Sequence, residues 1–219
     1  MMRADSPSGP CAAPRRACRR TLLLAGTAAG LLFLAACSAS PEIRYFRVDY
    51  PFPAPSADSP LPLTLGIARL AASEPYRQER IIYRTSPYQV QSYAYARWEA
   101  PPTDMVNELL LEQFAASGRF QRVVPWRRGE ALEYRLEARL RRFEELDEAD
   151  GWYGLVELEY ELVEGNGKSL LREIMSRRVR VETRTMDGIV DALSQGLRTG
   201  LDEVVAKTAA ALANQRRGS

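Results

Sequence analysis

The sequence contains no histidine, and only three of its 219 residues are cysteines. Without histidine, the Ser-His-Asp and Cys-His arrangements of nucleophilic catalysis are excluded, and so are histidine-rich zinc sites. The cysteines are Cys11, Cys18 and Cys37, all close to the N-terminus. If the chain is cut before Cys37, no free thiol remains for a disulfide or for a zinc or iron–sulfur site. We therefore expect no metal and no cofactor.

The apolar run near the N-terminus is too short for a membrane-spanning helix, which needs about 20 residues. This run, Leu22–Ala36, has 15 residues and is rich in Ala and Gly. A basic stretch with Arg15, Arg16, Arg19 and Arg20 comes directly before it. Basic, then apolar, then small residues is the order typical of a secretory signal peptide. We interpret residues 1–36 as a signal peptide, with an uncleaved signal anchor as the alternative.

The end of the apolar run, Leu34-Ala35-Ala36-Cys37, resembles the lipobox of bacterial lipoproteins. The resemblance implies that the chain is cut before Cys37 and that this residue carries acyl chains such as palmitate. Two or three chains anchor a protein stably, at about 0.8 kcal/mol per buried methylene, whereas one chain is marginal. Ser38, not an aspartate, follows. By resemblance to lipoprotein sorting signals, this implies the outer membrane, facing the periplasm, over the inner membrane. The Arg19-Arg20 pair leaves the export route, general secretory or twin-arginine, open.

The positive charge of the whole chain, +2, belongs to the segment that would be removed. Residues 1–36 hold five Arg and one Asp, so residues 37–219 carry a net charge of −2. A basic surface for nucleic acid is therefore not expected, and nucleic acid is not among the expected partners. The 183 residues that remain suffice for one domain with a sizeable core.

The first part of the mature chain, residues 37–60, is predicted to be a lipidated N-terminus followed by a proline-rich tether. Prolines favour an extended linker, and such a linker gives a folded domain reach from its anchor. Residues 61–214 are predicted to form a single domain. The prolines within residues 38–62 are Pro41, Pro51, Pro53, Pro55, Pro60 and Pro62.

Alternation of apolar and polar residues predicts strands over most of this domain. The three longest segments carry rows of charge, mostly Arg, then Glu, then Arg, which suit pairing across neighbouring antiparallel strands. The predicted segments are Leu61–Leu70, a hairpin over Glu79–Trp98 broken at Ser86-Pro87, Phe120–Trp126, and a meander of Tyr134–Arg141, Trp152–Leu162 and Leu170–Thr183.

Two amphipathic helices complete the prediction. The first runs to about Ser117 with Thr103 as its N-cap, and the second covers Asp187–Ala213 with apolar residues every three or four positions. Gly196 and Gly200 are interpreted as close packing of the second helix on the sheet, not as pairing within a membrane. The predicted fold class is α+β: an antiparallel β-sheet (meander) with two helices packed on one face.

Two further patterns resemble functional motifs but have simpler explanations. Gly165-Asn166-Gly167-Lys168-Ser169 lacks the earlier glycine of a phosphate-binding loop, because Leu162 stands there, and a strand follows where that motif requires a helix. The acidic residues near position 147 lack the spacing of a calcium loop and are expected to form a solvated loop. They are Glu144, Glu145, Asp147, Glu148 and Asp150.

Aromatic residues gather in the predicted hairpin and just after it. Tyr and Trp offer large amphipathic area, which is useful in cores and in interfaces. One interpretation is a hairpin with one buried face, and the other is a surface that binds a protein partner or lipid headgroups. The candidate partner-binding residues are Tyr83, Tyr88, Tyr93, Tyr95, Trp98, Pro101 and Pro102.

Short motifs follow one another through this region in a characteristic order. They are Tyr83-Arg84-Thr85-Ser86-Pro87-Tyr88, Tyr93-Ala94-Tyr95, Trp98-Glu99-Ala100-Pro101-Pro102 and Ser117-Gly118-Arg119-Phe120. In this order they resemble the ABC-type transport auxiliary lipoprotein family, and the resemblance covers nearly all of the mature chain. It implies a periplasm-facing lipoprotein that works with an MCE-domain protein, a membrane permease and an ATPase in moving lipids between membranes. It implies no catalytic residues.

The sequence thus favours a non-enzymatic, membrane-anchored accessory lipoprotein of an ABC/MCE-type phospholipid transport system. The alternative is an outer-membrane assembly or envelope-scaffold lipoprotein that binds protein or lipopolysaccharide. An envelope hydrolase has little support, because there is no histidine and no nucleophile elbow. Self-association stays open.

Overall fold

The structure is a computed structural model, and it describes residues 41–52, 54–56 and 58–218. The predicted signal peptide, residues 1–36, and the predicted acylation site, Cys37, lie outside the described residues. One compact unit comprises Glu42–Ser219.

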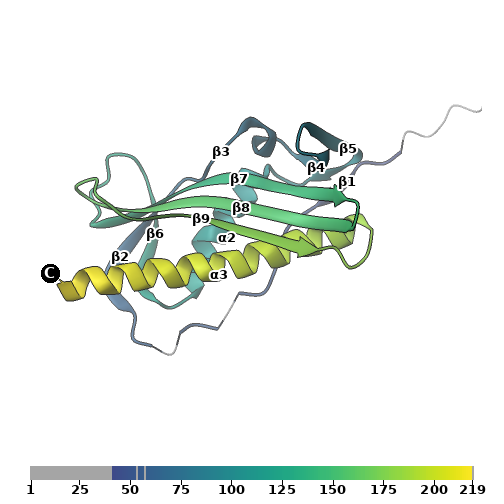
Figure 1. The fold of residues 1–219 in the computed structure, drawn as a ribbon. Coiled ribbons are helices and arrows are strands. Elements are labelled where there is room, and N and C mark those ends of the chain that lie inside the picture. Colours follow the sequence, from purple (N-terminus) through teal and green to yellow (C-terminus); the bar gives the residue numbers. More distant parts are fainter. Residues whose placement is uncertain (1–40, 53, 57, 219) are drawn as a thin grey trace, which may run out of the picture. The chain divides into compact units, whose positions relative to one another are not determined.

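The described part of this unit contains nine strands, two α-helices and one short 3₁₀ helix (Figure 1). The strands are β1 (Arg44–Phe46), β2 (Leu61–Ala68), β3 (Ala71–Ala72), β4 (Arg80–Ser86), β5 (Gln89–Trp98), β6 (Phe120–Trp126), β7 (Tyr134–Glu148), β8 (Gly151–Glu164) and β9 (Ser169–Arg180). The helices are η1 (Glu74–Arg77), α2 (Pro102–Ala116) and α3 (Met186–Gly218). The α+β class predicted from the sequence is confirmed.

The long strand β7 organises the sheet. On one side it pairs with β8, which pairs with β9, and both pairings are antiparallel. On the other side three strands pair with successive parts of β7: β2 near Leu136, β3 near Leu140 and β4 near Glu145. β6 extends the sheet beyond β2, while β5 and then β1 extend it beyond β4.

The sheet is mixed, although the sequence predicted an antiparallel one. The β7–β8–β9 meander and the β4–β5 hairpin are antiparallel as expected, but β2 pairs in parallel with both β6 and β7, and β4 pairs in parallel with β7. Period-two alternation identifies a strand but carries no information about the direction of its neighbour. The chain between β2 and β6 includes α2, and parallel strands need a long crossover of this kind.

The predicted charge rows pair across the meander. Glu159 on β8 binds Arg141 of β7 at 3.0 Å and Arg172 of β9 at 2.6 Å. The two arginines are exposed, so each of these pairs contributes little to stability. Their larger effect is on register, because a shift of one residue would turn these charges toward the core.

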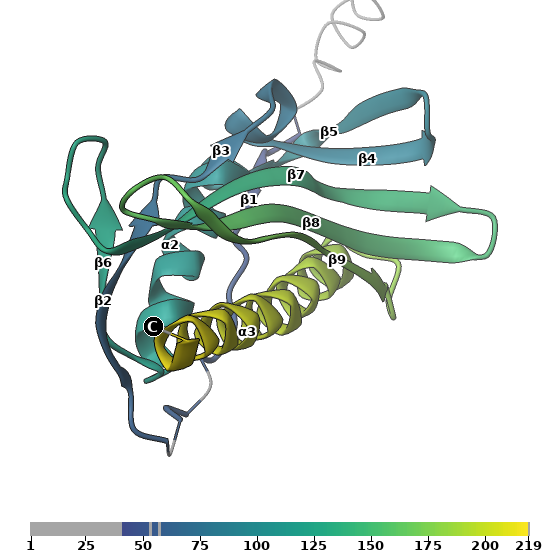
Figure 2. The ribbon, with the colours of Figure 1, turned by 60° about the vertical axis from the view of Figure 1, so that its left-hand side comes forward.

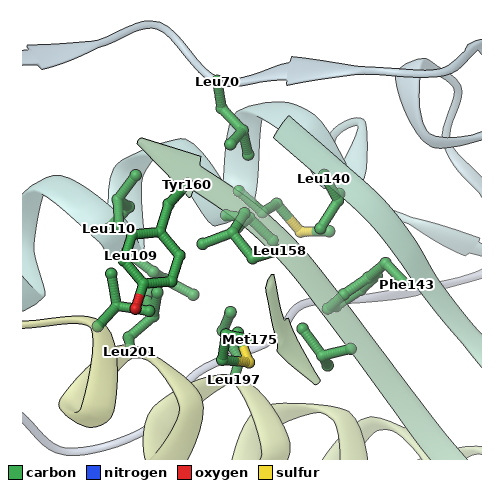
Figure 3. Packing of buried hydrophobic residues seen from close by; sticks show 14 of the residues in the cluster. Leu70, Leu109, Leu110, Leu140, Phe143, Leu158, Tyr160, Met175, Leu197 and Leu201 are labelled. Atoms are coloured by element: carbon green, nitrogen blue, oxygen red, sulfur yellow. The ribbon is translucent and has the colours of Figure 1, made fainter. Parts of the chain in front are cut away.

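α3 lies along one face of β8 and β9, and α2 packs beside it (Figures 1 and 2). Both helices are amphipathic, and their apolar sides meet the sheet in one core (Figure 3). The residues labelled there are Leu109 and Leu110 of α2, Leu197 and Leu201 of α3, Leu140 and Phe143 of β7, Leu158 and Tyr160 of β8, Met175 of β9, and Leu70. A Cβ at Gly200 would collide with the Met175 side chain, which agrees with the close packing expected at this glycine.

Much of the segment predicted as a tether belongs to the folded unit. β1 pairs with β5, the side chains of Val48 and Tyr50 are buried in the core, and the backbone N–H of Ser56 donates to the carbonyl of Ser117 at 2.8 Å. The prediction of a tether over residues 37–60 is therefore wrong for the described residues from Glu42 onward. Apolar residues between the prolines, Val48, Tyr50 and Phe52, pack against the domain.

α2 begins two residues earlier than predicted, because its N-cap is Pro101 and not Thr103. Pro101 precedes the helix and Pro102 is its first residue, a position where proline costs no hydrogen bond. Thr103 is therefore inside the helix, not its N-cap, and its hydroxyl donates to the carbonyl of Tyr76 at 2.7 Å. Across the described ranges, neither helix combines the length and the apolar character that crossing a membrane requires.

Candidate functional site: the tyrosine hairpin

The β4–β5 hairpin, residues 80–98, is called here the tyrosine hairpin. It lies on the side of β7 opposite β8 (Figure 2). Its strands are antiparallel, and β4 joins the sheet through short parallel pairing, Tyr83 with Glu145 and Arg84 with Leu146. The break predicted at Ser86-Pro87 is the turn of the hairpin.

A fully buried carboxylate fastens the hairpin to one face of the sheet. Glu144 on β7 accepts hydrogen bonds from Arg84 Nε at 2.8 Å, Arg142 Nε at 2.7 Å and the hydroxyl of Tyr76 at 2.7 Å. A buried charge is tolerated only when it is paired and hydrogen-bonded, and three donors meet that requirement. The pKa of the Tyr76 phenol is raised by burial and then by the charge of Glu144.

A second carboxylate fastens the hairpin from the other face. Adjacent residues of a strand point to opposite faces, so Glu145 lies on the side away from Glu144. Its Oε2 accepts a hydrogen bond from the hydroxyl of Tyr93 at 2.6 Å, and the Tyr93 ring packs on that of Tyr83 at 4.9 Å between centroids. Burial raises the pKa of Glu145 above its ordinary 4.5, and burial also raises the pKa of Tyr93.

The seven candidate partner-binding residues differ in how far their side chains are exposed to solvent. Trp98 is 1% exposed and packs against Phe143, with 5.4 Å between ring centroids, and Pro102 is buried at the start of α2. These two side chains belong to the core, so their assignment as partner contacts is corrected. Tyr83, Tyr93 and Pro101 are half-buried.

The remaining two tyrosines are open to solvent. Tyr88, in the turn, is 96% exposed, and Tyr95, near the end of β5, is more than half exposed. Val90, two residues after Tyr88, is exposed as well. Beside the turn, a hollow of about 370 Å³ is lined by the hairpin residues Arg84, Thr85, Ser86 and Pro87 and by the end of β7.

The outer edge of the hairpin is open over most of its length. β1 pairs only with Ala96–Trp98 of β5, and in the described part of the chain no strand pairs with the outer edge of β5 before Ala96. An unpaired edge presents free N–H and C=O groups that a strand of another chain can complete. The tyrosine hairpin therefore combines a base fixed on both faces with an exposed tip and an open edge.

Glu144 and Glu145 were missed by sequence reasoning, which placed the acidic stretch in a solvated loop. β7 extends to Glu148, and the turn to β8 consists only of Ala149 and Asp150. The loop prediction is therefore wrong for the residues up to Glu148. A signal was present in the sequence, because Phe143 and Leu146 are apolar residues among the charges and indicate that the strand continues. A register shift between Leu140 and Arg142 hides that continuation from a strict alternation count.

The two carboxylates do not form an acid–base pair, because they face opposite sides of β7 and do not converge on one substrate position. Across residues 41–218, apart from the two undescribed positions, no cluster of three acidic, histidine or cysteine residues has the arrangement of a metal site. The hairpin thus presents an exposed tip and an open edge on one side of an α+β domain.

Comparison with known families identifies the family of this α+β domain. The model of the ABC-type transport auxiliary lipoprotein component matches residues 50–205, and the chain belongs to this family. A comparison with curated proteins gave no match.

Solved structures share the fold. Protein XCC0632 from Xanthomonas campestris, of the DUF330 family, matches with a TM-score of 0.71 and 21% identity, over 80% of this chain and 99% of that one. An uncharacterized protein matches with a TM-score of 0.61 and 15% identity, over 76% of this chain and 99% of the other. At these identities the likeness concerns the fold alone.

Proposed function

We propose that this protein is a non-enzymatic accessory subunit of an ABC-type lipid transport system, held in the outer membrane by acyl chains on Cys37 and facing the periplasm. Its partners are an MCE-domain protein, a permease and an ATPase, and the cargo is phospholipid. Family membership supports the link to an ABC-type system, and the sequence motifs support the MCE partner. No ATP-binding loop is found in the sequence, as suits a subunit that depends on a separate ATPase.

The observation that carries the docking part of the proposal is the tyrosine hairpin. Its base is fixed by Glu144 and Glu145 on opposite faces of β7, while Tyr88 at its tip is almost fully exposed. A preformed surface loses little conformational entropy on binding, so an exposed aromatic residue on a rigid hairpin is a favourable anchor. The open edge of β5 allows the partner to add a strand beside it.

The docking proposal is tested by photo-crosslinking in cells. A photo-reactive phenylalanine analogue replaces Tyr88 in one variant and Ile174 in the other; Ile174 is an exposed apolar residue of β9, away from the hairpin. The proposal expects an adduct with the MCE-domain protein from position 88 only. Adducts from both positions, or an adduct at position 88 only with outer-membrane assembly proteins, would count against it and favour the scaffold alternative.

The anchoring proposal has a separate test. Mass spectrometry of the N-terminal peptide should show a chain that begins at Cys37 and carries diacylglycerol. Cys37→Ser should move the protein from the membrane fraction to the soluble periplasm or leave the signal peptide uncut. A wild-type chain that begins elsewhere and carries no lipid would refute the anchor.

A further inference from the structure

Exposed apolar side chains are concentrated at one edge of the sheet. Among the described residues six large apolar side chains are strongly exposed, and five of them belong to the tyrosine hairpin or to β1 and the residue before it. They are Ile43, Tyr45, Tyr88, Val90 and Tyr95, with Ile174 as the sixth. Tyr88 and Val90 lie at the hairpin tip, which leaves a second group at the β1 end.

The pairing of β1 with β5 places this second group on one face. Phe46 pairs with Trp98, and this side of the ladder faces the core, where Trp98 and Ala96 are buried. Side chains alternate along a strand, so Tyr45 and its partner Arg97 face outward. The same register, extended back by one residue, sets Ile43 opposite Tyr95 on that outward side.

We call the outward side of this ladder, Ile43, Tyr45, Tyr95 and Arg97, the outer ladder face. Ile43 is 44% exposed, Tyr45 62% and Tyr95 55%, so three apolar or aromatic side chains lie open beside a guanidinium. Tyrosine places an apolar ring and a polar hydroxyl in the same layer, which is why it is enriched where membranes meet water. Arg97 is half-buried, and its Nη1 donates to the carbonyls of Tyr93 and Ala96. Arg80, which pairs with Arg97 across the hairpin, is exposed and is the cation of this face suited to lipid phosphate.

The chain itself limits how far this face stands from an acyl anchor. Ile43 follows Cys37 by six residues, and six residues span at most about 20 Å when fully extended. The headgroup layer on one side of a bilayer is about 5–8 Å thick, from a total of about 40–45 Å and a core of about 30 Å. An anchor at Cys37 therefore keeps Ile43 within about 20 Å of the acylated residue, which is close enough for the first residues of β1 to reach the headgroups.

We propose that the outer ladder face rests on the headgroup layer of the membrane that holds the anchor, so that phospholipid is its occupant. The inference builds on the proposed acylation of Cys37 and goes beyond it, because a lipid anchor alone leaves the orientation of the domain free. The contact fixes that orientation. The hairpin tip, seven residues along β5 from Ala96 and thus about 23 Å away, is then left free for a protein partner.

The test uses the full acylated protein in vesicles of phosphatidylethanolamine and phosphatidylglycerol. The mature chain has no free thiol once Cys37 is acylated, so a single cysteine accepts one environment-sensitive fluorophore. The label is placed by Tyr45→Cys, Tyr95→Cys, Tyr88→Cys and Ile174→Cys, of which the last has the same exposure as Tyr95. On reconstitution, the emission of labels at positions 45 and 95 should shift to shorter wavelength. Nitroxide lipids should quench the fluorescence of these two labels several-fold more than that of labels at positions 88 and 174.

The experiment distinguishes a failure of the membrane contact of the outer ladder face from a failure of the lipid anchor on Cys37. If the protein is acylated and floats with the vesicles, yet positions 45 and 95 stay as exposed as position 174, the contact is overturned and the anchor stands. If the protein carries no lipid and does not float, the anchor fails and the contact fails with it. Shielding of positions 45 and 95 that arises only after partner proteins are added would replace the membrane by a protein and would also overturn the proposal.

Discussion

Glu144 is the residue on which the hairpin most depends. It is buried, and its three donors come from η1, β4 and β7 itself. Removing a buried carboxylate leaves Arg84 and Arg142 without their counter-charge, but both side chains still reach solvent in part. The cost therefore falls below the about 3–5 kcal/mol seen for fully buried pairs.

Glu144→Ala should lower the free energy of unfolding by about 2–3 kcal/mol. Glu148→Ala on the same strand is the matched control, because Glu148 pairs with Arg178 and both side chains are well exposed. The control should cost no more than about 1 kcal/mol. Urea unfolding of the two variants measures the difference, and equal losses would mean that Glu144 does not hold the hairpin.

The raised pKa of Glu145 predicts how the stability of the folded protein depends on pH. Burial raises its pKa in the folded protein above the ordinary 4.5, so its contribution to stability is complete at low pH and is lost as pH rises through the folded-state pKa. Glu145→Gln keeps an acceptor for the Tyr93 hydroxyl and removes the titration. The variant should lose less stability than the wild type between about pH 5 and about pH 8. Parallel stability curves for the two proteins would contradict the assignment.

Among the elements, the N-terminal segment is one whose packing against the domain could not be predicted from its own sequence. Its prolines are local features that favour an extended chain, but the burial of Val48 and Tyr50 depends on distant helices and strands. The same distinction holds elsewhere. β6 was predicted with its observed bounds, whereas the end of β7 was missed because a register shift interrupts its alternation.

A truncation tests whether this segment is part of the fold. A chain that begins at Pro51 loses β1, Val48 and Tyr50, and burial of the two side chains alone contributes about 1.5–3 kcal/mol each. Its free energy of unfolding should be at least about 3 kcal/mol below that of a chain that begins at Pro41. If the two chains unfold at the same denaturant concentration, the segment is a tether after all.

The contact between α3 and β8 is close enough to require glycine. A Cβ at Gly154 would lie 2.9 Å from the backbone nitrogen of Leu193, and neither backbone can yield without moving α3. Gly154→Ala should destabilise by about 2 kcal/mol. Gly196→Ala is the control, because its Cβ would meet Val179 at an ordinary 3.4 Å and alanine favours a helix by about 1 kcal/mol. Thermal unfolding should move in opposite directions for the two variants.

At the scale of the whole molecule, hydrophobic periodicity predicted the α+β class, the meander and both helices. The sequence did not predict that the sheet is mixed. The parallel pairing of β2 with β6 and β7 depends on how the crossover connections pack, and no pattern within those strands indicates it. For the candidate site, the sequence located the tyrosine hairpin. It did not separate Trp98, which belongs to the core, from Tyr88, which belongs to the surface.

The proposed role of this domain is that of the accessory lipoprotein of an ABC-type lipid transporter. Affinity purification of the full-length protein from crosslinked, detergent-solubilised envelopes, followed by mass spectrometry, tests it most directly. If the proposed role is right, an MCE-domain protein, its permease and its ATPase co-purify, and Tyr88→Ala reduces their recovery while Ile174→Ala does not. Recovery of outer-membrane assembly proteins alone, from cells that express the MCE-domain protein, would contradict it.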